Sequence, residues 1–175
     1  MGKTMKRHSW KILAGVIALL VAGCSQSPSG STNGPKVTVK DIAIAPFARG
    51  SSLASTTHVV NSGNEAAMNV KIAVTGTGII KGDAEPAGMD ALPADAASLP
   101  DIAPQAMTEL PAVNQRAIED EGDMRNFISG QWVLWVIGRV EYDDAAKKHH
   151  VSNFRWYYDY ETNAYKAADK GNDVN

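Results

Sequence analysis

From residue 36 onward the chain alternates between apolar and polar positions over short runs, which is the repeat of a β-strand. In the first run the phase slips between Val39 and Ile42, which indicates a β-bulge. The cleanest alternation of the first half begins at Met68 and ends at Val74. A cluster of turn-forming residues, Asn61-Ser62-Gly63-Asn64, precedes it. The predicted strands of the first half are therefore 36–47, 56–60 and 68–74.

The second half contains the most apolar strand, 131–142. One of its faces is apolar throughout, and the opposite face is apolar as far as Ile137. A strand that is apolar on both faces must be covered on both sides, so we expect it in the centre of a sheet. A polar hairpin loop at 143–147 leads to a return strand at 149–158, after which the apolar content falls.

Between these halves, residues 82–111 are rich in Ala, Pro and acidic residues. Their prolines forbid a long helix, so we expect a long and mostly irregular excursion, loosely ordered rather than functional. Residues 112–128 have moderate helical character, which Gly122 interrupts. Asp123 can cap a short final helix and Gly130 can end it.

These elements amount to about six or seven short strands with one or two short helices, which favours a mainly β fold, an Ig-like β-sandwich. An α+β domain with a single sheet is the alternative. We expect the Ig-like domain over 36–168, with the excursion 82–111 inside it, and a loose tail over 169–175.

The first eleven residues are basic, with four Lys or Arg and no acidic residue. The apolar or small-residue run that follows, Ile12–Ala22, is shorter than the ~20 residues that a membrane-crossing helix needs. A basic segment before a short apolar one is typical of a secretory signal peptide, which we place at 1–23.

The apolar run ends in Leu20-Val21-Ala22-Gly23-Cys24, which resembles the lipobox of bacterial lipoproteins. The resemblance implies a diacylglycerol on the Cys24 thiol, cleavage before Cys24 and acylation of the new amine, with palmitate as the expected chain. Two or more acyl chains anchor a protein stably. The alternatives are an ordinary signal peptide with an incidental cysteine and a retained membrane helix. Residues 24–35 then form the lipidated cysteine and a flexible tether of Gly, Ser, Asn and Pro.

Ser25 stands directly after the cysteine, where a residue other than Asp resembles the default for outer-membrane sorting. We therefore expect a lipid-anchored protein of the bacterial cell envelope, on the periplasmic side of the outer membrane if the organism has two membranes. Cys24 is the only cysteine, so no intramolecular disulfide can form and the domain depends on its core.

Without the predicted signal, 152 residues remain, which suits one domain with a core. They carry 13 basic and 19 acidic residues, a net charge of −6. No basic stripe of the kind that nucleic-acid-binding proteins use is present, so we expect no nucleic acid as a partner. Anionic lipid headgroups would not attract this charge, so the acyl chains must supply the anchoring.

Residues 56–172 resemble bacterial membrane-anchored proteins that consist of an N-terminal membrane segment and an Ig-like β domain without assigned activity. The matching motifs are short: Val59-Val60-Asn61-Ser62-Gly63-Asn64, Ala66-Ala67, Gly130, Val136-Ile137-Gly138, Tyr142-Asp143-Asp144, His149, Phe154 and Asn172. Arg155 stands where many of those proteins have a cysteine, and the hairpin glycine is missing. The resemblance implies the fold and no activity. It also suggests that Gly63 serves a turn with positive φ, and that Gly138 allows a neighbouring chain to approach closely.

The pair His149-His150 lies close to Asp143 and Asp144, and imidazole with carboxylate suits divalent metal ions. Adjacent residues of a strand point to opposite faces, so both histidines cannot easily serve one ion. We favour a polar hairpin end and expect no metal. His58 is isolated in the sequence, and we interpret it as a surface residue of a strand.

No nucleophile elbow, activated thiol, phosphate-binding loop, dinucleotide fingerprint or HExxH motif is found. The acidic run Glu119-Asp120-Glu121 reads as a solvated surface. We therefore expect neither catalysis nor a cofactor.

The last hairpin is rich in aromatic residues, which build either a core or, where exposed, a platform for sugar rings or a partner's apolar patch. Trp132 and Trp156 fit the core better. Trp135, Tyr157 and Tyr160 are the candidates for a ligand or partner surface.

These features lead to a binding or assembly module, anchored by lipid and joined to a protein partner in the envelope, whose open sheet edges can pair with a partner strand. The alternative is an envelope lipoprotein that binds a glycan or another small ligand through the Trp135 and Tyr157 face. An enzyme of unrecognised type is a third hypothesis.

Overall fold

The computed structural model describes residues 34–44, 55–110 and 121–175. The predicted signal peptide, Cys24, the tether as far as residue 33 and the first part of the predicted helix lie outside the described residues. All described residues belong to one compact unit, Thr32–Asn175. Within them, no helix has the length and apolar character needed to span a membrane.

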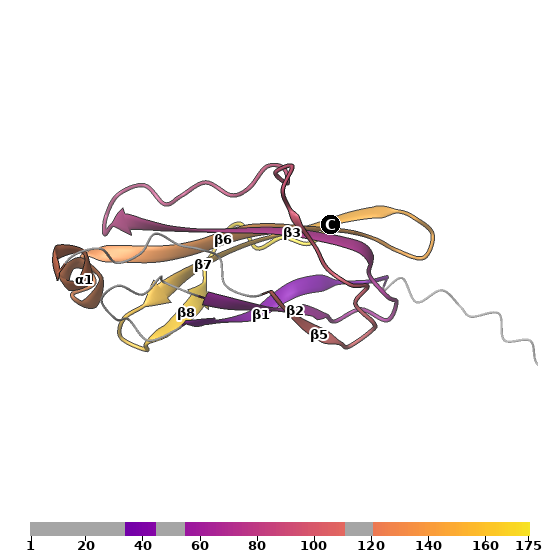
Figure 1. The fold of residues 1–175 in the computed structure, drawn as a ribbon, viewed down its shortest axis with the longest axis horizontal. Helices are drawn as coiled ribbons and strands as arrows, with labels where there is room; N and C mark the ends of the chain where they lie inside the picture. The colour runs from indigo at the N-terminus through magenta and orange to yellow at the C-terminus, as the bar shows by residue number, and fades with distance from the viewer. Residues whose placement is uncertain (1–33, 45–54, 111–120) are drawn as a thin grey trace, which may run out of the picture. The chain divides into compact units, whose positions relative to one another are not determined.

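The described chain forms two antiparallel sheets, which lie as two layers in Figure 1. The smaller sheet has the order β1-β2-β5 and the larger one the order β4-β3-β6-β7-β8. A short helix, α1, lies at one end of the larger sheet (Figure 1). The bounds of the elements are β1 Val37–Ile44, β2 Ser55–Asn61, β3 Met68–Ile80, β4 Ala97–Ser98, β5 Met107–Leu110, α1 Glu121–Ile128, β6 Trp132–Asp143, β7 His149–Asp159 and β8 Ala164–Ala167.

The hydrophobic core lies between the two sheets and draws on both of them. Val37 and Val59 of the smaller sheet and Ile72, Val136 and Val140 of the larger one are almost completely buried in a single cluster. This arrangement is consistent with a β-sandwich, so the prediction of a mainly β fold is confirmed. The alternative of an α+β domain with a single sheet is wrong, because a second sheet covers the first.

Two details of the predicted strands are confirmed. The register of β1 against β2 shifts between Val39 and Asp41, at the predicted bulge. The strand that is apolar on both faces, β6, lies in the middle of the larger sheet between β3 and β7. β3 is longer than predicted and continues to Ile80, because β6 pairs with it along this whole length despite two glycines.

The excursion 82–111 is not irregular throughout, since it supplies β4 and β5. Ile102 is buried and forms an antiparallel bridge with Ala67. The side-chain amide of Asn61 donates a hydrogen bond of 3.0 Å to the Ile102 carbonyl. Backbone pairing and the buried side chain of Ile102 therefore hold this stretch in place. Its proline-rich composition gives no sign of this order.

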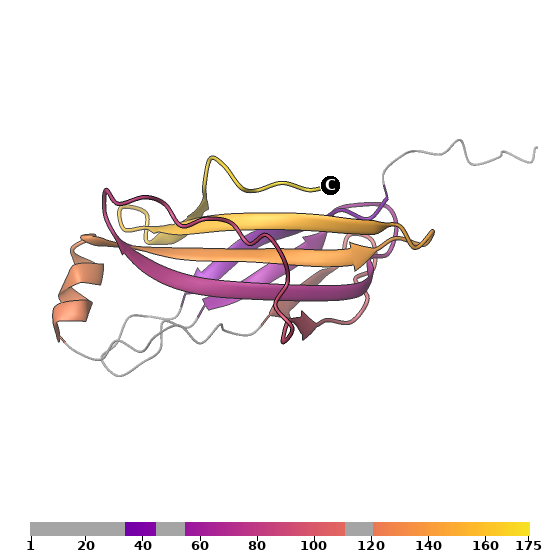
Figure 2. The ribbon, with the colours of Figure 1, turned by 90° about the horizontal axis from the view of Figure 1, so that it is seen from above.

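The residues 169–175, expected as a loose tail, pair with β7 instead. The backbone N–H of Asn153 donates to the Asp173 carbonyl at 2.9 Å, and Ser152 bridges to Val174. In Figure 2 the tail lies beyond β7, on the side away from β6. The tail makes its contacts through backbone groups and through the polar side chains of Asn172 and Asp173, so its sequence carries no apolar signal for them.

The predicted reason for Gly138 is confirmed, because a Cβ there would lie 2.1 Å from the Phe154 ring and 2.6 Å from the Ala73 carbonyl oxygen. The predicted reason for Gly63 is wrong, since its φ is not positive. A Cβ at Gly63 would instead lie 2.2 Å from the carbonyl oxygen of Gly34, so the position needs glycine for space.

The helix also differs from the prediction at its beginning. Within the described residues α1 covers Glu121–Ile128, so Gly122 lies inside it and does not interrupt it. Gly130 has a φ of 68° and its N–H donates to the Phe127 carbonyl, so it ends the helix as predicted.

Candidate functional site

The two adjacent histidines of the hairpin contact different carboxylates. His149 Nδ1 lies 3.2 Å from Asp143, whereas His150 Nε2 lies 3.0 Å from Asp144 and its ring stacks on Tyr142. The contact with His150 lowers the pKa of Asp144. The described parts of the chain contain no group of three or more His, Cys, Asp or Glu residues that could hold a metal ion. This end of the hairpin is a pair of separate His–Asp contacts.

His58 is not isolated in the structure. Its ring bonds to Asp41 of β1 through Nδ1 and lies 3.4 Å from Glu109 of β5 through Nε2. The hydrogen bond to Asp41 raises the pKa of His58, and the charges of both acids act in the same direction. Strands distant in sequence bring these groups together, so no spacing in the sequence could have revealed the cluster.

Trp135 is not an exposed platform, because only 4% of it is accessible to solvent. The Arg155 guanidinium lies 5.2 Å from the centre of the indole ring, and Tyr157 packs beside the ring at 5.5 Å. Glu85, from the excursion, holds the same guanidinium at 2.9 Å. The outer face of the larger sheet is therefore covered here, which explains how β6 can be apolar on both faces.

Tyr157 and Trp135 still border a hollow of about 300 Å³, together with Ile80, Lys81 and Glu85. The indole Nε1 of Trp135 is buried and has no hydrogen-bond partner within the described part of the chain. Polar atoms buried in this way usually find a partner, so this indole N–H carries an uncompensated desolvation cost in the fold.

Tyr160 does not belong to the same surface. It packs edge-on against Tyr158, with ring centres 4.8 Å apart, next to the core between the sheets. Burial raises the pKa of its hydroxyl well above the ordinary value. Of the three candidate residues, the structure therefore brings together only Trp135 and Tyr157.

β3 forms the border of the larger sheet along most of its length, as Figure 2 shows. On its outer side β4 pairs only with Lys71 and Ile72. From Val74 to Ile80 the strand pairs with β6 on its inner side, and no other described strand pairs with it. This stretch is an open sheet edge.

A groove of about 320 Å³ runs beside the beginning of this edge. Val74 and Thr75 of β3 form one wall, and Met89, Pro93 and Asp95 of the excursion form the other. An open edge beside an apolar groove offers both backbone hydrogen bonds and room for side chains.

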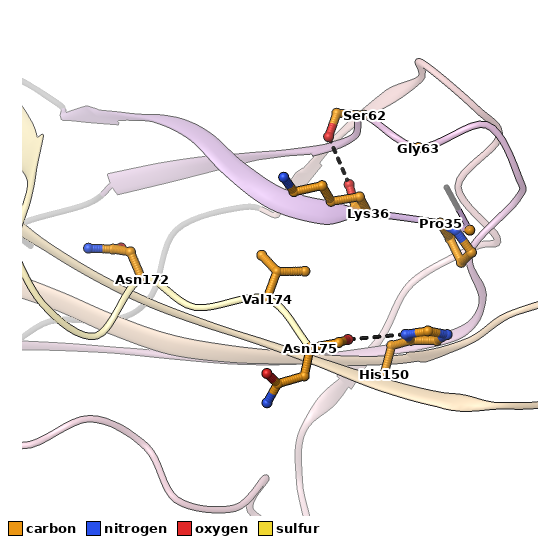
Figure 3. Close-up of a pocket in the computed structure, with 9 residues that line it drawn as sticks. Pro35, Lys36, Ser62, Gly63, His150, Asn172, Val174 and Asn175 are labelled. Carbon is orange, nitrogen blue, oxygen red and sulfur yellow. Dashed lines mark hydrogen bonds between the residues drawn. The ribbon is translucent and has the colours of Figure 1, made fainter. Parts of the chain in front are cut away.

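A second hollow, of about 650 Å³, is lined mainly by polar groups. Figure 3 places Lys36 and Ser62 on one side of it and His150 and Asn175 on the other. His150 Nδ1 lies 3.1 Å from the Asn175 backbone oxygen, and the Ser62 hydroxyl donates to the Lys36 carbonyl at 3.2 Å. The polar groups of this hollow largely bond to one another, which leaves fewer of them for a ligand.

Comparison with known proteins gives no relative from which a function could be carried over: no protein-family model, no curated protein and no solved structure matches this chain.

The open edge of β3 was not identified from the sequence. The only signal was the run 72–80, which contains neither a charged residue nor a proline. In the structure, β6 pairs with this run on one side, and β4 is too short to cover the other side. The run is therefore an exposed edge.

Proposed function

We propose that this chain is a lipid-anchored protein of the bacterial cell envelope, with an Ig-like sandwich that binds or assembles with another envelope protein and performs no catalysis. The observation that carries the proposal is the open edge of β3 from Val74 to Ile80. Unpaired strand edges are ready templates for another chain, and natural domains commonly protect them unless they use them.

The strand order supports the Ig-like assignment. Taken along the chain, β1-β2-β5 and β4-β3-β6-β7 correspond to strands A-B-E and C′-C-F-G of an immunoglobulin domain that lacks strand D. β8 and the tail then extend the second sheet. In this fold class the loops cluster at the two ends of the sandwich, and loops held by a rigid scaffold commonly carry binding residues.

The anchor rests on the lipobox resemblance at Leu20-Val21-Ala22-Gly23-Cys24 and on the tether that follows. A domain on a lipidated tether meets partners within a thin layer next to the membrane, which raises their effective concentration. Where the organism has two membranes, the proposed site is the periplasmic side of the outer membrane.

The test is in-cell cross-linking of the anchored protein, followed by mass spectrometry, with Cys24→Ala as the unanchored form. Labelling with a palmitate analogue, followed by mass spectrometry of the mature N-terminus, measures lipidation directly. Label on Cys24 and a specific partner that is lost in Cys24→Ala support the proposal. An unlabelled protein excludes the anchor, and the absence of any partner from both forms excludes the binding module.

A second candidate function is the binding of a glycan or another small ligand in the hollow beside Trp135 and Tyr157. The hollow of about 300 Å³ that both aromatic side chains border favours it. A panel of envelope glycans, titrated against tryptophan fluorescence of the native protein and of Tyr157→Ala, tests this. Saturable quenching that Tyr157→Ala weakens supports the second candidate, and an unchanged spectrum across the panel rejects it.

A further inference from the structure

We propose that the open edge of β3 binds an extended segment of the partner that carries Lys or Arg, and that this segment adds a strand to the larger sheet. The inference rests on the proposed binding module and specifies its site and the chemistry of its partner. Three properties of the edge carry it: the direction of its backbone groups, its lack of protection and the charge of its surroundings.

The backbone groups of β3 alternate between its two sides. The carbonyl of Val70 accepts a bond from Leu99 on the outer side, whereas the N–H of Lys81 donates to Gln131 on the side of β6. Since the register against β6 is regular from Lys71 to Ile80, the even-numbered residues direct their N–H and C=O outward. The outward groups that no described strand pairs with are the N–H and C=O of Val74, Gly76 and Gly78 and the N–H of Ile80, because the Ile80 carbonyl accepts a bond from the Asp83 N–H.

On the opposite side of the same sheet, the chain itself covers β7, so that the sheet ends there in the short β8 and the tail. β8 pairs with β7 from Trp156 to Asp159, and the tail continues along β7 as far as Val151. The edge of β3 has no such cover among the described strands, and 72–80 has none of the lysines or prolines that commonly block edge pairing.

The charged residues around the edge determine which charge a bound segment should carry. The excursion that borders the groove holds six acidic residues and no Lys, Arg or His between residues 82 and 110, and the two nearest lysines along the chain, Lys71 and Lys81, lie on either side of the open stretch. Asp95 lines the groove itself, and Arg155 neutralises Glu85 outside it. The acids of the excursion are Asp83, Glu85, Asp90, Asp95, Asp101 and Glu109.

A second copy of this chain is a poor occupant by the same reasoning. Two β3 edges paired with each other would bring two acidic excursions together, and like charges at short range oppose association. A basic segment instead gains attraction to the rim in addition to the backbone hydrogen bonds.

The experiment uses the full chain in its unanchored Cys24→Ala form and a short synthetic peptide of alternating valine and lysine. Binding is measured by fluorescence anisotropy, and exchange of individual amides with deuterium is measured by NMR with and without the peptide. We expect protection of the amides of Val74, Gly76, Gly78 and Ile80 on binding. The amides of Thr75, Thr77 and Ile79 already face β6 and serve as internal controls that stay unchanged.

Two controls separate strand addition from simple attraction of charges. The same peptide with alternate backbone nitrogens methylated keeps its charge and loses its pairing edge, so it should not protect the even-numbered amides. Thr75 is exposed on the outer face, and the matched variants Thr75→Lys and Thr75→Glu both introduce a long unbranched side chain and differ from each other mainly in charge. We expect the dissociation constant to rise roughly threefold to tenfold in the first variant and to fall in the second.

Alternating protection with the predicted charge dependence supports the inference. Four results would each overturn it. The peptide could bind without protecting the amides, or the even-numbered amides could already exchange slowly in the free protein. A valine–glutamate peptide could bind equally well, or the protein could dimerise through this edge. If cross-linking in cells captures a partner while the peptide fails these tests, the proposed function stands and this inference falls. If the peptide pairs with β3 while no partner is captured in cells, the edge can bind a strand and the proposed role in the envelope is rejected.

Discussion

The hydroxyl of Tyr142 accepts a hydrogen bond of 3.2 Å from the backbone N–H of Val37, across 105 positions of the chain. The same hydroxyl donates to the Pro35 carbonyl at 3.4 Å. Val37 begins β1, and Tyr142 lies near the end of β6 in the opposite sheet. One buried side chain therefore fastens the beginning of the domain to the second sheet.

Tyr142→Phe should lower the free energy of unfolding by about 1–2 kcal/mol, because it removes both bonds and leaves the Val37 N–H without this acceptor. Urea denaturation measures the loss. Tyr157→Phe is the matched control, since the Tyr157 hydroxyl makes no hydrogen bond to the described residues and its loss should cost little. Equal destabilisation by the two variants would contradict the role of Tyr142.

Asn61→Ala should be more destabilising, by about 3 kcal/mol. The buried amide accepts bonds from the N–H groups of Lys36 and Gly63 and donates to the carbonyls of Glu65 and Ile102. The groups of Lys36, Gly63 and Glu65 would lose this partner, whereas the Ile102 carbonyl still accepts a bond from the Ala67 N–H.

The isosteric Asn61→Asp separates the two halves of this network, because a carboxylate accepts both N–H bonds and donates neither of the others. We expect it to be destabilising as well. Asn64→Ala, exposed in the same turn, is the control. If Asn61→Ala unfolds at the same urea concentration as the control, the network does not hold the excursion to β2.

Gly138→Ala should cost about 3 kcal/mol or more, because its methyl group would overlap both the Phe154 ring and the Ala73 carbonyl. Gly88→Ala is the matched control, since a Cβ there meets nothing within 4 Å. Thermal unfolding of the two variants compares them. A Gly138→Ala protein as stable as Gly88→Ala would show that β6 and β7 are spaced more widely than described.

The His58 cluster should make stability depend on pH. Its pKa is raised from 6.5, chiefly by the hydrogen bond to Asp41, so protonated His58 stabilises the fold below pH 6.5. This contribution is lost as the pH rises through the folded-state pKa. Since both acids are well exposed, we expect no more than about 1 kcal/mol.

The measurement is the difference in unfolding free energy between the native protein and His58→Gln, taken at about pH 5 and about pH 9. The difference should be positive at the lower pH and should vanish at the higher one. Asp41→Asn should remove most of this pH dependence. A difference that grows towards high pH would reverse the proposed sign.

The central position of β6 could be predicted because burial on two faces requires apolar residues at consecutive positions, and the sequence of β6 has them. Gly138 could be explained for a similar reason, since a glycine in a strand marks close approach. Gly63 was explained wrongly, because the obstacle to its side chain is Gly34, which comes near only through the tertiary structure. The burial of Trp135 could not be predicted, because its cover comes from Arg155 on β7, held by Glu85 of the excursion.

The sequence by itself determined the mainly β character, the bulge in β1 and the place of β6, because each depends on the local order of apolar, polar and glycine residues. It also contains the lipobox-like stretch from which the proposed anchor is argued. Only the tertiary structure decided that the tail covers the edge of β7 and that β3 keeps an open edge beside acidic residues. Those features depend on backbone hydrogen bonds between distant segments, and every residue except proline carries the same backbone donor and acceptor, so side-chain patterns cannot encode them directly.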